Sequence, residues 1–151
     1  MQSLIKFSLP VYYTVERKRT KIITTKSKKT GKISTREVKD TVHLVGQNWF
    51  RNVHHHTKNV VKRHYHELVA QAVVGQNSIE GKYKTYFTYY YKNKGSDATN
   101  VIPQIEKFAL DGLIEAGMIE EDNVLFNIAS DGWEVCEDKL NPRLEIEIRS
   151  V

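Results

Sequence analysis

The chain of 151 residues contains a single cysteine, Cys136, so an intramolecular disulfide is excluded and a reducing compartment is indicated. Acidic neighbours disfavour a thiolate, so this cysteine is interpreted as a packed or inert thiol. No apolar run approaches the length of a membrane span, and the amino terminus lacks the basic and then apolar pattern of a secretory signal. These absences predict a soluble cytoplasmic protein without a membrane partner.

Acidic residues are scarce in residues 1–95, which carry 19 Lys and Arg against 5 Asp and Glu. From Ser96 onward the counts are 4 against 13, so a net charge of +14 is followed by one of −9. Lysine and arginine neutralise phosphates, whereas clustered carboxylates hold the divalent cations that activate water. The pattern suits an enzyme that cuts a polyanion, although an ordinary basic domain with an acidic end has the same composition.

Large apolar residues are almost absent after Ile23 within residues 16–40, which hold ten basic and three acidic residues. Such a segment cannot pack a core, and we interpret it as a solvent-exposed basic hairpin or mobile arm. A solvated loop without a partner is the simpler interpretation, and contact with nucleic acid is preferred to it.

The remaining composition is globular, with 40% hydrophobic and 27% charged residues, and the length fits one domain over residues 1–151. Apolar alternation and β-branched or aromatic content predict strands over 3–9, 11–15, 83–91, 123–128, 133–135 and 143–149. Helical spacing predicts helices over about 58–72 and 100–116. The order indicates a mixed α/β (α+β) fold, a small mixed sheet with two main helices packed on it and the basic segment inserted after the first strand.

Boundaries and faces of these elements follow from individual residues. The first helix is expected to bury Val60, Val61, Tyr65, Leu68, Val69 and Ala72, and to end at Gly75-Gln76-Asn77-Ser78. The second is expected to bury Ile102, Ile105, Ala109, Leu113 and Ala116. Thr99 or Asn100 is the expected N-cap, Pro103 lies in the first turn, and Gly117 follows the last. Ser130-Asp131-Gly132 is expected to form a turn.

The strand over 83–91 bears aromatic residues on both faces, so we expect it to be central or covered on both sides. A row of tyrosines can also stack on unpaired bases, but core packing is the preferred interpretation.

Five histidines, His54, His55, His56, His64 and His66, resemble a metal cluster at first sight. Consecutive histidines are not expected to face one ion together, positions i and i+2 of a helix point apart, and no partnering cysteine or HExxH spacing occurs. A polar or phosphate-contacting surface is therefore preferred to a zinc site, and it would make binding depend on pH.

The acidic half contains the residue types of a magnesium-dependent phosphodiesterase: Asp97, Asn100, Lys107, Asp111, Glu121 and Asp122. Carboxylates and an amide oxygen suit a hard cation, and a lysine can stabilise charge on phosphate. Each residue also has a simpler explanation. Asp97 can cap a loop, Asp111 can pair with Lys107, and Glu120 to Asp122 can form a solvated turn.

Three segments together resemble the RusA family of Holliday junction resolvases. They are Ser96-Asp97-Ala98-Thr99-Asn100, then Glu106-Lys107-Phe108-Ala109-Leu110-Asp111-Gly112-Leu113, then Glu115-Ala116-Gly117-Met118-Ile119-Glu120-Glu121-Asp122-Asn123-Val124. That family has an Asp-x-Asp-Asn segment, a Lys-x-x-x-Asp-x-Leu helix, a glycine, and an acidic pair before a strand. The opening Leu4–Pro10 segment and the closing Arg143-Leu144-Glu145-Ile146 are similar to its first and last strands.

The resemblance implies a phage-type or prophage-type endodeoxyribonuclease that resolves four-way and other branched DNA as a homodimer with Mg²⁺, or alternatively Mn²⁺, in the host cytoplasm if it is phage-encoded. It implies catalytic roles for Asp97, Lys107, Asp111 and Asp122. The implied metal ligands are Asp97, Asn100, Asp111, Glu121 and Asp122. Backbone phosphates would be held by Arg17, Lys18, Arg19, Lys21, Lys26, Lys28, Lys29, Arg51, Lys58, Lys62, Arg63, Lys92 and Lys94.

The chain departs from the family pattern at two points. Thr99 stands where the second Asp is expected, and the interval from Asn100 to Asp111 is about four residues longer, which is one helical turn of roughly 6 Å. A helix of 17 residues is about 25 Å long and separates Asp97 from Asp122. They share a site only if the helix is shorter, the flanking loops fold back, or a second subunit contributes.

Two other functions remain open on the sequence. One is a catalytically inactive module of the same fold that binds DNA junctions or single strands, which Thr99 favours. The other is a basic RNA-binding or virion-associated protein in which Tyr86 to Tyr91 form a stacking surface.

Overall fold

The computed structural model describes residues 2–16 and 21–151, without the side chains of 21–23 and 36–38. Within these residues the chain forms eight strands and three helices, so the predicted mixed α/β class is confirmed. The strands are β1 (Leu4–Pro10), β2 (Tyr12–Val15), β3 (Lys21–Lys26), β4 (Ile33–Val38), β5 (Thr41–Leu44), β6 (Tyr83–Tyr91), β7 (Asn127–Glu137) and β8 (Arg143–Ser150). The helices are α1 (Gln47–Asn52), α2 (His55–Ala72) and α3 (Ala98–Glu115).

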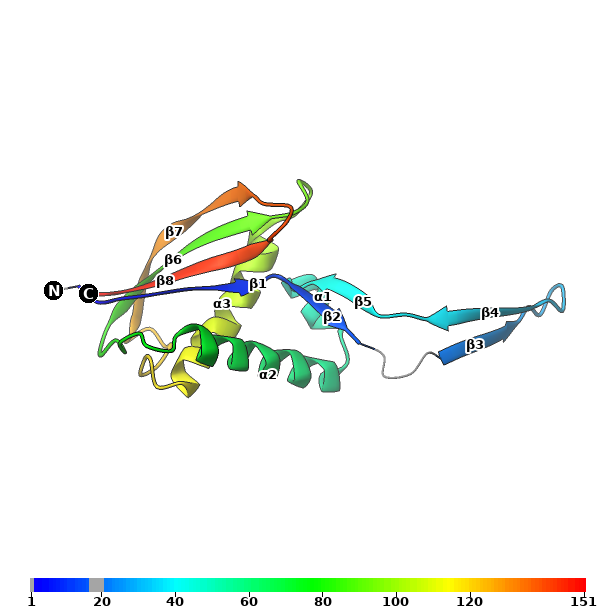
Figure 1. Ribbon diagram of the computed structural model, residues 1–151, viewed down its shortest axis with the longest axis horizontal. Helices are drawn as coiled ribbons and strands as arrows, with labels where there is room; N and C mark the ends of the chain where they lie inside the picture. The colour runs from blue at the N-terminus through cyan, green and yellow to red at the C-terminus, as the bar shows by residue number, and fades with distance from the viewer. Residues whose placement is uncertain (1, 17–20) are drawn as a thin grey trace.

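The main sheet has the strand order β1-β8-β6-β7 (Figure 1). Strand β8 pairs antiparallel with both β1 and β6, whereas β7 joins the other edge of β6 in parallel. The first and last strands of the chain are therefore neighbours, and the two termini lie side by side. The central position expected for the tyrosine-rich strand is confirmed.

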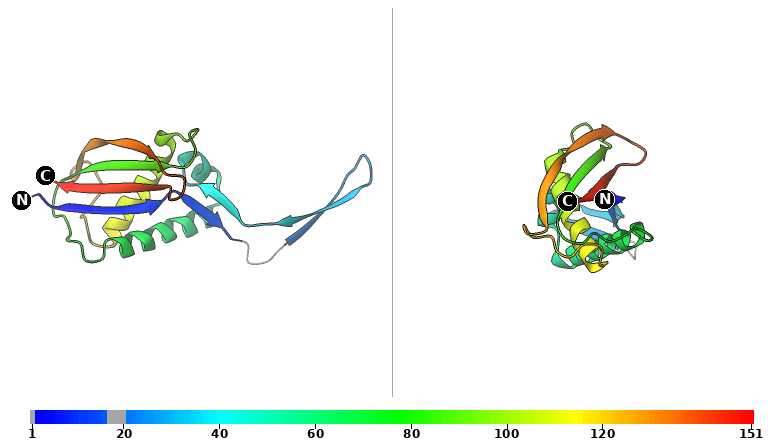
Figure 2. Two further views of the ribbon diagram at one scale, coloured as in Figure 1. Left: turned by 45° about the horizontal axis from the view of Figure 1, so that its top comes forward. Right: turned by 90° about the vertical axis from the view of Figure 1, so that its left-hand side faces the viewer.

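One face of this sheet is covered by α2 and α3 (Figure 2). Residues alternate between buried and exposed along β1 and between buried and half-buried along β8. Ile5, Leu144, Ile146 and Ile148 are fully buried. Helices α2 and α3 touch where the ring of Tyr65 stacks on Phe108, with centroids 4.9 Å apart. Only one face of β6 is fully buried, so of the two arrangements expected for this strand the structure has the central one.

The outer face of β6 is lined by arginines of β8. The guanidinium of Arg143 lies 3.7 Å from the ring of Tyr90, and that of Arg149 lies 4.9 Å from the ring of Tyr86. These cation–π contacts occupy ring faces that would otherwise be open to bases.

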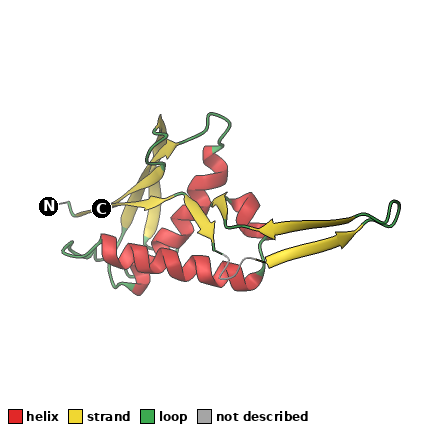
Figure 3. Cartoon of the chain, turned by 45° about the vertical axis from the view of Figure 1, so that its right-hand side comes forward, coloured by secondary structure: helices red, strands yellow, loops and turns green. Residues whose placement is uncertain are grey.

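The described part of the basic segment forms an antiparallel hairpin of β3 and β4, with Lys21 paired to Val38 and Lys26 to Ile33. A second short pair, β2 and β5, connects this hairpin to the body, from which it projects (Figure 3). In the connecting turn, Gly31 has φ +67° and its N–H donates to the Ser27 carbonyl at 2.9 Å. The exposed basic hairpin predicted from composition is thus present.

The predicted strand over 123–128 and the predicted turn over 130–132 are both wrong. Asn123 starts a turn, since its carbonyl accepts from Phe126 and Asn127 and its side chain accepts from the Leu125 N–H. Strand β7 then runs through Asp131 and Gly132. Its pairing with β6 shifts register there, and Gly132 has a φ of +98°. The strand is predicted from the apolar residues Val124 and Leu125, but both side chains are exposed in the turn.

The helix boundaries also differ from those expected. Asp97 is the N-cap of α3 in place of Thr99 or Asn100, so Pro103 falls in the second turn, and Ala116 is an exposed C-cap. Gly117 follows with φ +74°, as predicted. Helix α2 begins at His55, and its Val60 and Ala72 face solvent because the buried stripe runs through Val61, Tyr65 and Val69. In the described part of the chain, no helix is long and apolar enough to cross a bilayer.

Candidate functional site

The structure brings together three of the residues singled out in the acidic half. The Lys107 ammonium lies 3.1 Å from Asp111 Oδ1 and 3.0 Å from Asp122 Oδ2. Lys107 and Asp111 are one turn apart on α3, so helical geometry alone makes them neighbours. Asp122 comes from the loop that follows the helix, and its approach depends on how that loop folds back.

Two backbone hydrogen bonds and two buried side chains hold this loop against the body. After Gly117 reverses the chain, the Met118 N–H donates to the Leu113 carbonyl at 2.8 Å, which closes the end of the helix. The Ile79 N–H then donates to the Met118 carbonyl at 2.8 Å, and the side chains of Met118 and Ile119 are buried. Asp122 is thereby placed beside the polar face of α3.

Acidic groups dominate the electrostatics of this cluster. The hydrogen bonds that Lys107 donates to Asp122 and then to Asp111 raise the pKa of Lys107, which keeps its ammonium charged. The Tyr83 hydroxyl donates to the Glu121 carbonyl at 2.9 Å, and its pKa is raised by burial and then by Asp122. Burial raises the pKa of Glu106 as well.

Asp111 and Asp122 suit a divalent cation in part. Both offer hard oxygen ligands and are about a quarter exposed, and sites for Mg²⁺ often use one or two carboxylates with water and phosphate oxygens. Their two carboxylate oxygens both lie within 3.1 Å of one ammonium nitrogen, so they converge on a position that already holds a cation. Glu121 is exposed beside them, and among the described residues no three carboxylates gather closely enough to share one ion.

Asp97 and Asn100 do not join this cluster. Asp97 Oδ1 accepts from the Thr99 N–H at 3.0 Å and from the Thr99 hydroxyl at 2.7 Å, which caps α3. Ten residues of helix, about 15 Å, separate Asp97 from Lys107 along the axis. The helix has 18 residues, so the obstacle expected from the sequence is present within one chain.

Asn100 instead ties α3 to the start of α1. Its Oδ1 accepts from the Asn48 N–H at 3.0 Å. A Cβ at Gly46 would lie 2.3 Å from the Asn100 amide nitrogen, so only glycine permits this close approach. The contact gives Asn100 a structural role.

The basic residues expected to hold phosphates fall into separate groups. Arg17, Lys18 and Arg19 lie outside the described residues, and Lys21 opens β3. Lys26, Lys28 and Lys29 are exposed at the far end of the hairpin. Lys92 lies 5.7 Å from the Tyr12 ring, and Lys94 lines a groove beside Asp97.

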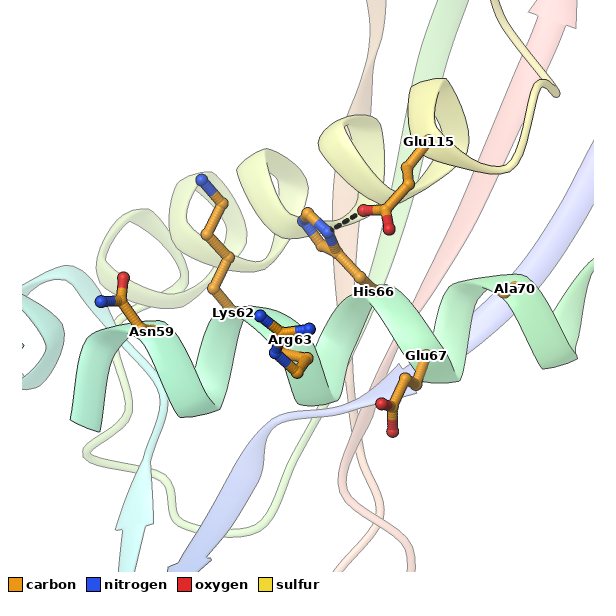
Figure 4. A pocket seen from close by; sticks show the side chains of 7 residues that line it. All are labelled: Asn59, Lys62, Arg63, His66, Glu67, Ala70 and Glu115. Carbon is orange, nitrogen blue, oxygen red and sulfur yellow. Dashed lines mark hydrogen bonds and ion pairs between the residues drawn. The ribbon is translucent and has the colours of Figure 1, made fainter. Parts of the chain in front are cut away.

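A second basic group lies on α1 and α2. The Lys58 ammonium donates to the Arg51 carbonyl at 3.2 Å, and the exposed Lys62 and Arg63 line an open pocket of about 430 Å³ (Figure 4). In that pocket the ring of His66 is hydrogen-bonded to Glu115 of α3. This contact makes His66 a link between α2 and α3. The other ring nitrogen of His66 is buried without a partner in the described structure.

The expectation that His54, His55 and His56 cannot face one point is wrong. Their ligand atoms all lie within 4.8 Å of one another, and the three rings are exposed. His54 precedes the helix in an extended conformation and accepts from the His56 N–H, so the three rings do not fan out at helical spacing. His64 and His66 do point apart, toward Tyr13 and Glu115 respectively.

Sequence reasoning missed two residues of the acidic cluster, Tyr83 and Glu106. The sequence predicts only that Tyr83 belongs to the strand. Its second role follows from its position at the start of β6, next to the returning loop. Glu106 precedes Lys107, but adjacent helical positions face different directions, so no local pattern indicates its burial.

No protein-family model matches this chain, and a search of curated proteins finds no significant match. The likeness to the resolvase family therefore rests on the quoted sequence segments alone.

Proposed function

We propose that this protein is a structure-specific endodeoxyribonuclease that cuts branched DNA at the cluster of Lys107, Asp111 and Asp122. The supporting observation is that Lys107 lies between two carboxylates from separate segments. The resemblance assigns a role to each of these three residues. Lys107 and Asp122 are 15 positions apart in the sequence, so their contact depends on the fold.

The chain's own groups have distinct tasks in this proposal. Asp111 and Asp122 would hold the divalent cation, which supplies a polarised phosphate oxygen and a more acidic bound water. That cation would take the place of the Lys107 ammonium between the two carboxylates, which frees Lys107 for the substrate. The Lys107 side chain is 61% exposed, so its ammonium can donate to a phosphate oxygen as charge develops there.

Binding of the polyanion is assigned to the basic groups. The exposed lysines of the hairpin and the cations of α2 project from different elements, so together they follow an extended backbone and read its shape. A homodimer would present two such clusters, which suits two opposed cuts in a symmetric junction.

The test is incubation with a labelled mobile four-way junction, with and without Mg²⁺, using Asp122→Asn and Asp111→Asn beside the unchanged protein. Metal-dependent symmetric nicks that vanish in both variants, with junction binding retained, would support the proposal. Loss of binding together with cutting would contradict the assigned roles. An equal loss in Asp97→Asn, with junction binding retained, would instead require that a partner subunit brings Asp97 to the cluster.

A second candidate is a module that binds junctions or single strands without cutting them. It is favoured by the Thr99 hydroxyl, which donates to Asp97 where the family has a second carboxylate. Tight, salt-sensitive binding without nicks in either Mg²⁺ or Mn²⁺ would select this function.

A further inference from the structure

A groove lies between the edge strand β7 and the start of α3, away from the Lys107 cluster. Trp133 and Val135 pair in register with Phe87 and Tyr89, so all four side chains point to the face covered by helices. Phe87 and Tyr89 are 3% and 1% exposed, whereas Trp133 and Val135 are 50% and 47% exposed. Cover by the helices therefore ends at β6, and the inner side of β7 is left open.

The groove measures about 440 Å³ and combines flat apolar walls with two charges of opposite sign. Tyr89, Tyr91 and Trp133 supply the aromatic surface, and Lys94 and Asp97 lie at its border. The Tyr89 hydroxyl is 2.6 Å from the Ser96 hydroxyl, which fixes the loop that carries Lys94. This volume lies within the range of small-molecule sites.

The chemistry of the walls selects one class of ligand. Aromatic side chains stack on a flat neutral ring, and the Asp97 carboxylate accepts hydrogen bonds but repels phosphate. Only Oδ1 of Asp97 is engaged within the described residues, which leaves Oδ2 for a ligand donor. Lys94 can meet a phosphate just outside the groove.

A second copy of this chain is a poorer occupant. The edge of β7 carries Glu134 and Glu137, and antiparallel or parallel pairing with the identical edge would bring like charges together.

We infer that this groove binds one unstacked nucleobase of single-stranded or branched DNA, with the base against Trp133 and its amino or ring N–H groups on Asp97. Guanine presents two adjacent N–H donors that can both reach the free Oδ2 of Asp97, whereas thymine presents one, so guanine is preferred. The inference rests on the nucleic-acid binding of the proposed function and is independent of cleavage.

The test uses Trp133 as its own probe. In a Trp49→Phe background Trp133 is the one remaining tryptophan. Titration with the trinucleotides d(TGT) and d(TTT) should quench its emission, with tighter binding of d(TGT). Trp133→Ala, followed by fluorescence anisotropy of labelled d(TGT), should lower affinity by about 5- to 150-fold, the range for loss of one stacked base. Tyr86→Ala, which removes a ring from the opposite face, should leave affinity unchanged.

Asp97→Asn tests the polar contact, because asparagine caps a helix as well as aspartate does. It should abolish the preference for d(TGT) over d(TTT), and a preserved preference would refute the contact. Unchanged Trp133 emission in a protein that still binds four-way junctions would overturn the groove and leave the proposed function standing. Emission that shifts with protein concentration alone would also overturn it, since a second copy would then cover Trp133.

Discussion

At the scale of single residues, Lys107 is expected to contribute to cutting but little to stability. Its side chain is 61% exposed, and exposed ion pairs contribute little to folding. Lys107→Met should therefore leave the melting temperature nearly unchanged but lower the rate of junction cutting by about 10²- to 10³-fold, as for the loss of one donor to a developing charge. Single-turnover cutting and thermal unfolding measure the two effects.

Lys139→Met is the matched control for that change, because Lys139 is similarly exposed and pairs with Glu137 at 3.5 Å. Its cutting rate should equal that of the unchanged protein. A Lys107→Met protein that cuts at the normal rate would remove the lysine from the proposed site.

Glu106 carries a prediction about pH. Burial raises its folded-state pKa above the ordinary value of 4.5, so the folded protein favours the neutral acid. Its contribution to stability is complete below that ordinary value and is lost as the pH rises through the raised folded pKa. Glu106→Gln should therefore raise the melting temperature at pH 7.5 and have little effect at pH 4.

Thermal unfolding at both pH values checks this, with the exposed Glu120→Gln as control. An equal shift at the two pH values would assign the effect of Glu106→Gln to packing and contradict an ionisation origin.

At the scale of elements, the contact between α2 and α3 depends on one glycine. A Cβ at Gly112 would lie 2.9 Å from the Val69 side chain. Gly112→Ala should destabilise the protein by about 1–3 kcal/mol through overpacking, and Val69→Ala in the same chain should relieve part of that loss. Denaturant unfolding of the two single variants and the double variant measures the coupling.

Gly95→Ala is the control for the substitution itself, since a Cβ there meets nothing within 4 Å. Additive losses from Gly112→Ala and Val69→Ala would show that the two positions do not clash.

Local sequence patterns predict some of these elements and contacts but not others. Alternation in Arg143–Ser150 and aromatic density in Tyr83–Tyr91 suffice to predict β8 and β6, because side-chain period and burial agree there. The pairing of Lys107 with Asp111 follows from helical spacing. The approach of Asp122 does not, since it depends on Gly117 and on the contact of Ile79 with Met118, 39 positions apart. The sequence predicts only a short strand around Trp133, because the half-exposed position of this side chain depends on where the cover by α3 ends.

At the scale of the whole molecule, charge is divided between a projecting basic hairpin and a body that carries the acidic cluster (Figure 1). If the hairpin holds DNA phosphates, each lysine that contacts one contributes about 0.9 to the slope of log affinity against log salt. Replacing Lys26, Lys28 and Lys29 by glutamine should therefore weaken junction binding at low salt and reduce that slope by up to about 2.7. Anisotropy of a labelled four-way junction between 50 and 300 mM salt, about the range over which such slopes are resolved, measures both.

A parallel variant with Lys62 and Arg63 replaced by glutamine compares the α2 surface with the hairpin. Both groups are exposed, so neither change should disturb the core. If only the α2 variant alters the slope, the hairpin does not touch the duplex and its lysines serve solvation. If both do, the phosphates span the distance from hairpin to helix, and one duplex arm must lie along the length of the molecule, since a compact ligand cannot neutralise both groups at once.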